Sequence, residues 1–136
     1  MVLVDTNVLL DVLEDDPDWA EWSIRQLRAL SQVNALRINP IIYAELSLAF
    51  ESLSRLDRAI AGMQIGYDEI PRAGLFLAGR AFVRYRREGG QKSKVLPDFL
   101  VGAHAAVAGC RVLTRDPRRY RHYFPTVEVI APASRA

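Results

Sequence analysis

Four acidic residues stand in sequence surroundings that predict burial rather than free exposure to solvent. Asp5 directly follows an apolar N-terminal run, and Glu45 lies inside an apolar stretch. Asp98 opens a second apolar stretch, and Asp116 comes two residues after a strand candidate. If these carboxylates gather, two of them about 4 Å apart repel by about 1 kcal/mol in water and about 4 kcal/mol at an effective dielectric constant of 20. Such a cluster must therefore retain protons or bind a cation.

The oxygen donors of this cluster favour a hard divalent cation. The chain has one cysteine, Cys110, and two histidines that lie apart in the sequence, so a zinc site built from thiolate or imidazole is not expected. Carboxylate ligands instead select Mg²⁺ or Mn²⁺. Such an ion activates water for in-line attack on a phosphodiester and neutralises the charge that develops on the phosphate.

Each acid also has an ordinary structural explanation. Asp5 can cap the helix that follows it, and Asp98 can be an acid of a first helical turn, favoured by the helix dipole. Asp116 precedes a proline and can start a turn, while Glu45 can face water. Taken one by one these explanations suffice, but they do not account for all four acids falling at one edge of the predicted fold.

The elements that must position the four acids alternate between strands and helices. Strands are expected over residues 1–5, 36–38, 67–70, 111–114 and 127–130. Helices are expected over residues 6–13, 17–30, 40–49, 56–63, 71–88 and 98–108. This alternation predicts one domain over residues 1–136, with a three-layer α/β/α architecture and a mostly parallel central sheet of about five strands. In such sheets the ligand crevice lies at the carboxyl ends of the strands, where Asp5 and Asp116 are placed.

Charge is unevenly distributed along the chain. Residues 1–71 carry 12 acids and five bases, a net charge of −7, whereas residues 72–136 carry 13 bases and four acids, a net charge of +9. The basic half indicates a polyanionic partner, although solvated helix faces are the commoner reason for surface charge. The candidates for binding such a partner flank the pair Gly89-Gly90 or stand beside Asp116: Arg84, Arg86, Arg87, Lys92, Lys94, Arg115, Arg118 and Arg119. Three interleaved aromatic residues, Tyr120, Tyr123 and Phe124, are candidates for stacking on bases, with core packing the favoured role for Phe124.

Composition argues against a membrane protein. The longest uncharged stretch, residues 99–110, has 12 residues and includes a histidine, whereas a membrane span needs about 20 apolar residues. The apolar N-terminus has no basic flank and meets Asp5 at once, so a secretory signal is not expected. A single cysteine is in keeping with a reducing cytoplasm.

Five segments carry a resemblance to a known family. They are VDTNVLLD at 4–11, INPIIYAELSLAF at 38–50, LAGRAFVRYRREGG at 77–90, LPDFLVGAHA at 96–105 and LTRDPRRYRHYFP at 113–125. Together, and in this order, they resemble a PIN-domain protein, specifically a VapC-type toxin of a type II toxin–antitoxin system. The resemblance covers nearly the whole chain.

The resemblance implies a Mg²⁺- or Mn²⁺-dependent endoribonuclease toxin. The acidic quartet of the family falls on Asp5, Glu45, Asp98 and Asp116, of which Asp5, Asp98 and Asp116 are expected to hold the metal. Two further polar positions of the family match Asn7 and Thr114. A further helix acid of the family is absent, because Val101 and Gly102 occupy that stretch, and this leaves open whether a second metal binds. The resemblance also implies an RNA substrate, a small cognate antitoxin that blocks the site, and a homodimer.

Two other readings stay open at this point. A catalytically silent PIN-fold module that binds RNA or serves as a scaffold would share the fold. A phosphotransferase of another α/β class would also place an acid after the first strand. The aspartyl-phosphatase pattern, however, requires a second Asp where Asn7 stands, and a receiver domain requires a late lysine, whereas Lys92 and Lys94 lie in a predicted loop.

Overall fold

The computed structural model describes residues 1–133, so the last three residues of the predicted domain lie outside the described part. Five strands form one sheet: β1 (Val2–Val4), β2 (Leu36–Ile38), β3 (Gly66–Tyr67), β4 (Arg111–Leu113) and β5 (Val129–Ile130). In this described part, seven helices connect or flank them: α1 (Thr6–Leu13), α2 (Ala20–Ser31), α3 (Pro40–Ser47), α4 (Leu53–Gly62), α5 (Arg72–Arg87), α6 (Pro97–Ala108) and α7 (Arg118–Tyr123).

The sheet is parallel throughout and has the order β3-β2-β1-β4-β5. The central strand β1 is fully buried, because its three residues have no solvent-exposed surface. In its register, Val2 lies opposite Leu36 of β2 and Arg111 of β4. A parallel strand buried on both faces requires helices on both sides of the sheet. The predicted three-layer α/β/α fold is therefore confirmed, with all strands rather than most of them parallel.

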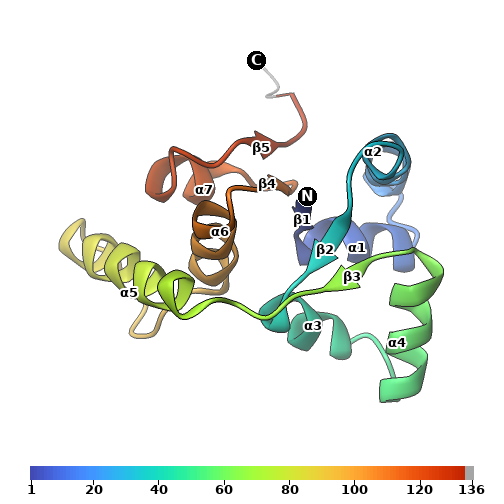
Figure 1. The fold of residues 1–136 in the computed structure, drawn as a ribbon, viewed down its shortest axis with the longest axis horizontal. Helices are drawn as coiled ribbons and strands as arrows, with labels where there is room; N and C mark the ends of the chain where they lie inside the picture. The colour runs from blue at the N-terminus through green and yellow to red at the C-terminus, as the bar shows by residue number, and fades with distance from the viewer. Residues whose placement is uncertain (134–136) are drawn as a thin grey trace.

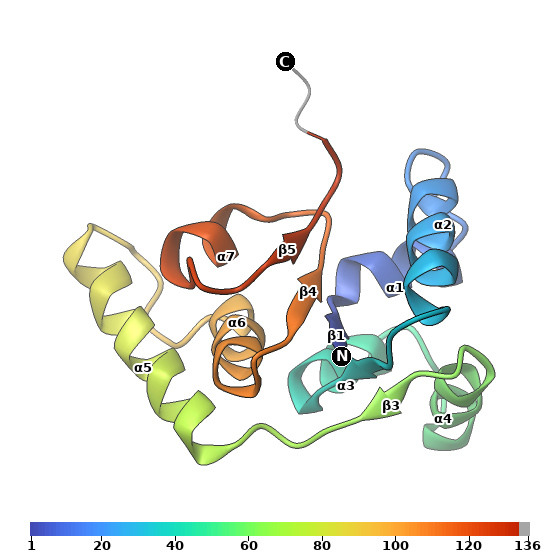
Figure 2. The ribbon, with the colours of Figure 1, turned by 45° about the horizontal axis from the view of Figure 1, so that its top comes forward.

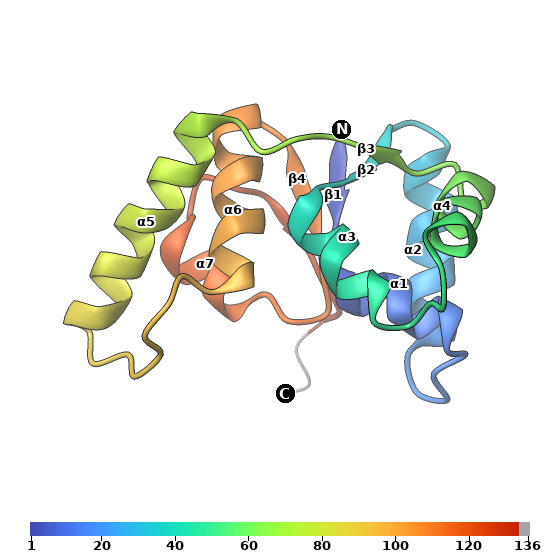
Figure 3. The same ribbon diagram turned by 90° about the horizontal axis from the view of Figure 1, so that it is seen from below.

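Figure 1 shows how the chain is distributed around this sheet. The helices α5, α6 and α7 gather on one flank, whereas α1, α2 and α4 lie on the other. Figures 2 and 3 show the same grouping from other directions, with α3 between the two groups. Within each flank, helices that follow one another in the sequence pack together: α5 with α6, α6 with α7, and α1 with α2. The acidic and basic halves of the sequence thus occupy opposite flanks of the molecule.

Local sequence signals explain where α3 and α6 begin and end. Asn39 caps α3 because its Oδ1 accepts hydrogen bonds from the backbone amides of Ile41 (3.0 Å) and Ile42 (3.1 Å), and Pro40 occupies the first helical turn. The helix α6 also begins at a proline and ends at Gly109, whose φ of 67° lies in the left-handed region that glycine adopts without strain.

Most predicted elements are present with shifted ends, and one helix was missed. The helix α2 begins at Ala20 rather than residue 17, and α4 begins at Leu53 rather than residue 56. The third and fifth strands are shorter than expected, with two residues each. The missed helix is α7, which lies between the fourth and fifth expected strands, where no helix is expected from the sequence. Within residues 1–133, no helix has the length and apolar character needed to cross a membrane.

Candidate active site

Asp5 is the buried centre of the candidate site. It follows β1 directly and remains in the sheet ladder, since its amide donates to the carbonyl of Leu113 (2.9 Å). Its Oδ1 accepts from the amide of Thr6 (2.8 Å), and its Oδ2 accepts from the hydroxyls of Thr114 (2.8 Å) and Tyr120 (2.9 Å). Burial raises the pKa of Asp5 from 3.8 to about 6, against the lowering effect of these hydrogen bonds. Nearby Asp98 adds to the rise through charge repulsion.

Thr114 links Asp5 to the loop that carries Asp116. Its hydroxyl donates to Asp5 and accepts from the amide of Asp116 (3.1 Å) and from Nδ2 of Asn7 (3.3 Å). The Oδ1 of Asn7 in turn accepts from the amide of Arg115 (3.1 Å). One hydroxyl and one amide side chain therefore hold the loop after β4 against the start of α1. The structure brings together the two supporting residues predicted from the sequence, Asn7 and Thr114.

Three of the four candidate acids lie near enough to Tyr120 to act on its hydroxyl through their charge. This tyrosine is only 1% exposed, and its pKa is raised well above its usual range, first by burial and then by the negative charges of Asp5 and Asp98, with a smaller effect from Glu45. Glu45 lies on α3 and accepts a hydrogen bond from the hydroxyl of Thr6 (2.7 Å). Acids from the end of β1, from α3 and from α6 are thus neighbours of this tyrosine, near the carboxyl end of the central strand.

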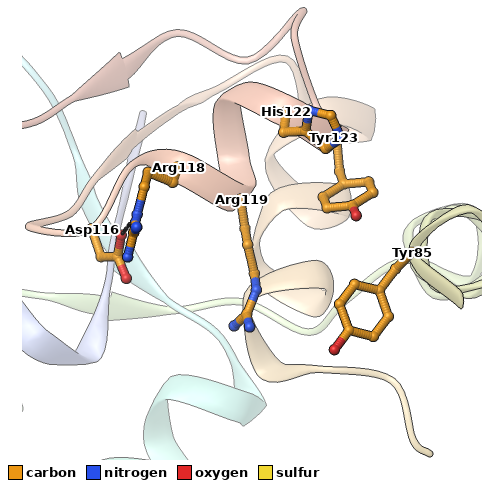
Figure 4. Close-up of a pocket in the computed structure, with 6 residues that line it drawn as sticks. All are labelled: Tyr85, Asp116, Arg118, Arg119, His122 and Tyr123. Atoms are coloured by element: carbon orange, nitrogen blue, oxygen red, sulfur yellow. Dashed lines mark ion pairs between the residues drawn. The ribbon is translucent and has the colours of Figure 1, made fainter. Parts of the chain in front are cut away.

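The fourth acid, Asp116, is turned toward solvent. Its side chain is 63% exposed and lies 3.6 Å from Nε of Arg118. Asp98 is paired as well, because its Oδ2 accepts from Nη1 of Arg119 at 3.2 Å. Asp116 and both arginines line a pocket of about 400 Å³ that Tyr85, His122 and Tyr123 complete (Figure 4). The four acids are therefore not equivalent: three act on Tyr120 through their charge, and Asp116 faces this pocket.

The donor chemistry fits a hard divalent cation, although the side chains do not yet converge as ligands. Within residues 1–133 no Lys or Arg forms an ion pair with Asp5. Its Oδ1 accepts a single hydrogen bond, whereas a carboxylate oxygen can accept two. Among the described residues, however, no three His, Cys, Asp or Glu side chains lie close enough to hold one ion together. A cation bound here would have to draw Asp98 or Asp116 away from its arginine.

The basic residues predicted to bind a polyanion fall into three groups. Arg118 and Arg119 line the pocket beside the acids. The group at the end of α5 and in the loop after it is exposed: Arg84, Arg86, Arg87, Lys92 and Lys94. Within this group Arg86 donates to the carbonyls of Gly90 and Lys92 (both 3.0 Å), which ties the loop to the helix end. Arg115 forms the third group, because its Nε is held by buried Asp11 at 2.6 Å.

The aromatic residues of the same segment have different roles. Tyr120 is buried and bonded to Asp5, so this candidate is not available to stack on bases. Phe124 is 3% exposed and packs in the core, as favoured. Tyr123 is half-buried, and its hydroxyl donates to Glu88 (2.8 Å) at the end of α5. The four-residue spacing of Tyr120 and Phe124 after Pro117 is the helical signal that could have revealed α7 and its buried face.

Sequence reasoning missed two further contributors. Thr6 joins Asp5 to Glu45, since its amide bonds one carboxylate and its hydroxyl bonds the other. Asp11 is buried and accepts from Ser23 (2.8 Å) as well as from Arg115. Because Arg115 adjoins Asp116, this contact ties the loop after β4 to α1 and α2. The sequence signal that could have revealed Asp11 is its spacing from Asn7, since the two residues lie one helical turn apart on α1.

Packing explains why α6 has no further acid near the site. A side chain at Gly102 would collide with the ring of Phe124, and Val101 is 1% exposed. The space that an acid would need is filled by the contact between α6 and α7. Among residues 1–133 the candidate site is therefore limited to the four acids already described.

Comparison with known proteins places this geometry in a family. The family model for the PIN domain matches residues 2–125, whereas no match is found among curated proteins. A chain of the Rickettsia felis VapBC2 complex bound to a promoter DNA fragment superposes with a TM-score of 0.72 at 16% identity, covering 96% of this chain and 98% of that one. A chain of DNA-bound VapBC from Salmonella typhimurium gives 0.70 at 20% identity, covering 96% of each chain.

A chain of a toxin–antitoxin complex from Klebsiella pneumoniae gives a TM-score of 0.61 at 22% identity, covering 93% of this chain and 95% of that one. At these identities the three structures establish a shared fold. The family match extends over almost the whole described chain and includes all four acids at the sheet edge. The chain therefore belongs to the PIN-domain family.

Proposed function

We propose that this PIN-domain chain is a divalent-metal-dependent endoribonuclease that acts as the toxin of a toxin–antitoxin system. The observation that carries the proposal is the charge balance at Asp5. A carboxylate that is 7% exposed, with a pKa raised to about 6 and two further acids nearby, lacks a cationic partner within residues 1–133. Burying an unpaired charge is costly unless a cation compensates it, and a divalent ion at this edge would do so.

In this proposal, Asp5 and Asp98 hold Mg²⁺ or Mn²⁺ together with Asp116, through oxygen atoms or bound water. Such an ion, when bound, lowers the pKa of water and neutralises charge on a phosphate. Thr114 and Tyr120 keep the Asp5 carboxylate in one orientation through their hydroxyls. Glu45, fixed by Thr6, completes the ligand set or orients the attacking water.

The proposed substrate is RNA held by the basic flank. Arg118 and Arg119 lie closest to the acids, and Arg84, Arg86, Arg87, Lys92 and Lys94 extend the positive surface along the end of α5. We assign Arg115 to positioning the loop rather than to binding RNA, because Asp11 and Trp19 hold its side chain. Contacts to phosphates are independent of sequence, so this surface supplies affinity rather than a choice of cleavage site.

The proposed partners follow from the structures that share the fold. Two of them are named as VapBC bound to DNA and a third as a toxin–antitoxin complex. For this chain we propose a cognate antitoxin that covers the acidic edge, a homodimeric assembly and a cytoplasmic location.

Cleavage of total RNA tests the proposal. Purified protein, stripped of any co-purified protein, is incubated with total RNA in Mg²⁺, Mn²⁺ or EDTA, next to Asp98→Asn. We expect discrete cuts that disappear in EDTA and fall at least roughly 100-fold in the variant, because even outer partners of a metal site change activity by 10–100-fold. Asp18→Asn, at an exposed acid on the other flank, is the matched control.

Other outcomes separate the remaining readings. RNA binding that is unaffected by Mg²⁺, with no cuts in any RNA, would favour the silent binding module. A covalent adduct after incubation with acetyl phosphate would favour the phosphotransferase. Cleavage of single-stranded DNA in preference to RNA of the same sequence would replace the proposed substrate.

A further inference from the structure

The pocket between α5 and α7 contains an arginine that has two possible partners. Arg119 extends from α7 into the pocket, between the Asp116–Arg118 pair and the rings of Tyr85 and Tyr123 (Figure 4). Its Nη1 also donates to Oδ2 of Asp98 at 3.2 Å. The same guanidinium therefore faces a proposed metal ligand and an open, basic pocket.

The ion pair with Asp98 is formed in a partly solvated place. The side chain of Asp98 is 31% exposed, and that of Arg119 is 45% exposed. Ion pairs with this degree of exposure are worth only about 0.2–1 kcal/mol, so the pair is readily broken. A divalent cation on Asp98 would repel the guanidinium and take its place at the carboxylate.

The pocket offers a released Arg119 a phosphate site. Its walls hold a second arginine, Arg118, which is 90% exposed and only loosely paired with Asp116 at 3.6 Å. His122 also lines the pocket. A guanidinium recognises phosphate oxygens with two parallel hydrogen bonds, and a pocket of about 400 Å³ accommodates a phosphate together with part of its nucleotide.

We propose that this pocket binds a backbone phosphate of the substrate strand, and that Arg119 is shared between that phosphate and Asp98. Without ligands Arg119 neutralises Asp98. When Asp98 binds a divalent cation, Arg119 transfers to the phosphate, so that metal binding and strand binding favour each other. This inference rests on the proposed function for the identity of the strand and the metal. It adds a subsite and a coupling residue to that site.

The first test measures Mn²⁺ affinity by calorimetry, without any RNA. Arg119→Gln removes the competitor for Asp98 and is expected to tighten Mn²⁺ binding by a factor of about 1.4 to 5, which corresponds to about 0.2–1 kcal/mol. Arg119→Lys keeps the positive charge and is expected to return the affinity toward that of the wild type. Arg121→Gln, on the same helix, makes the same change in net charge at an exposed position and is the control. Equal Mn²⁺ affinities for the Arg119→Gln and Arg121→Gln variants would overturn the proposal.

The second test is a double-mutant cycle of RNA affinity in EDTA, where no cleavage occurs. Asp98→Asn frees Arg119 and is expected to tighten the binding of a fluorescent oligoribonucleotide in the wild-type and Arg121→Gln backgrounds. In the Arg119→Gln background the gain should be smaller by a factor of about 1.4 to 5, because no arginine is released. A simple loss of negative charge predicts the same gain in every background, and that additive result would also overturn the proposal.

These readouts are independent of catalysis. If the protein cuts no RNA but shows the tighter Mn²⁺ binding and the non-additive cycle, then the proposed activity fails while the role of Arg119 stands. If cleavage is confirmed and the cycle is additive, then the activity stands and the sharing of Arg119 fails. Thermal unfolding of each variant checks that the protein remains folded.

Discussion

At the scale of single residues, the candidate site depends on Asp5, whose buried surroundings disfavour the charged form of its carboxylate. Asp5 accepts three hydrogen bonds, yet its pKa is raised to about 6 because burial outweighs them. The folded protein thus binds a proton at Asp5 more tightly than the unfolded chain does. The free energy of unfolding must therefore fall as the pH rises between these two pKa values.

The Asp5→Asn variant measures how much the ionisation of Asp5 lowers the free energy of unfolding. Relative to the wild type, its free energy of unfolding should improve by roughly 2 kcal/mol between pH 4 and pH 8, since each pKa unit corresponds to about 1.36 kcal/mol and the unfolded carboxyl is already more than half ionised at pH 4. Urea unfolding in EDTA at both pH values gives the difference. Asp18→Asn controls for the loss of one exposed negative charge. A constant difference between the Asp5→Asn variant and the wild type across this range would contradict the assigned environment.

Asp11 stabilises the loop after β4 through a contact with a residue 104 positions away. Its carboxylate is 3% exposed and bonded to Arg115 and Ser23. Replacing it by Asn leaves the guanidinium without its anion, and we expect a loss of roughly 1–3 kcal/mol in the free energy of unfolding, less than for a fully buried pair. Asp15→Asn, at an exposed acid close by, is the control for urea unfolding. Equal losses for the two variants would show that the contact does not hold the loop.

At the scale of elements, the site requires α6 and α7 to approach closely. Gly102 of α6 lies against the ring of Phe124 just after α7, and α7 supplies Tyr120 to Asp5 and Arg119 to Asp98. An added methyl group at Gly102 would push α7 away. Both the hydroxyl on Asp5 and the arginine on Asp98 would then be displaced together.

Gly102→Ala is expected to lower the free energy of unfolding by roughly 1–3 kcal/mol, the usual cost of overpacking. Gly79→Ala is the matched control, because Gly79 also lies inside a helix but has open space around it. That control should be neutral or more stable by roughly 0.5–1 kcal/mol, since glycine weakens a helix interior. Thermal unfolding of both variants gives the comparison. Equal effects would mean that the contact between α6 and Phe124 is looser than it is in the structure.

At the scale of the whole molecule, the fold turns a charge difference along the chain into one between two flanks. Residues 1–71, with a net charge of −7, form the flank with α1, α2 and α4, whereas residues 72–133, with a net charge of +8 (12 bases and four acids), form the flank with α5, α6 and α7 (Figure 1). RNA should therefore approach from the positive flank, and its binding should weaken with salt as counterions are released.

The salt dependence of RNA binding in EDTA tests this orientation. Replacing Lys92 and Lys94 by Gln should reduce the slope of log K against log salt by about 1.4, since each phosphate contact on a single strand contributes about 0.7. The double substitution of Arg25 and Arg28 by Gln, on exposed positions of α2, makes the same change in net charge on the opposite flank. It should leave the slope almost unchanged. A similar fall in both variants would mean that net charge alone governs binding.

The sequence by itself determined the layers of the fold and the edge at which the acids gather. Strand and helix signals are local, because they depend on apolar spacing, prolines and glycines within a few residues, as at Pro40 and Gly109. Once a parallel sheet is expected, the topology places Asp5 and the loop with Asp116 at one edge. Knowledge of side-chain contacts is not needed for that conclusion.

Only the tertiary structure decided how the acids differ from one another. Asp5 is held by Tyr120, 115 residues away, and Asp98 is paired with Arg119, while Asp116 turns outward to Arg118. The helix α7 could not be predicted for the same reason. Its six residues are too few to form a stable helix alone, so the helix depends on packing against α6. Contacts of this kind arise when distant segments pack together. Burial and charge pairing, rather than residue type, then determine which carboxylate is available to a cation.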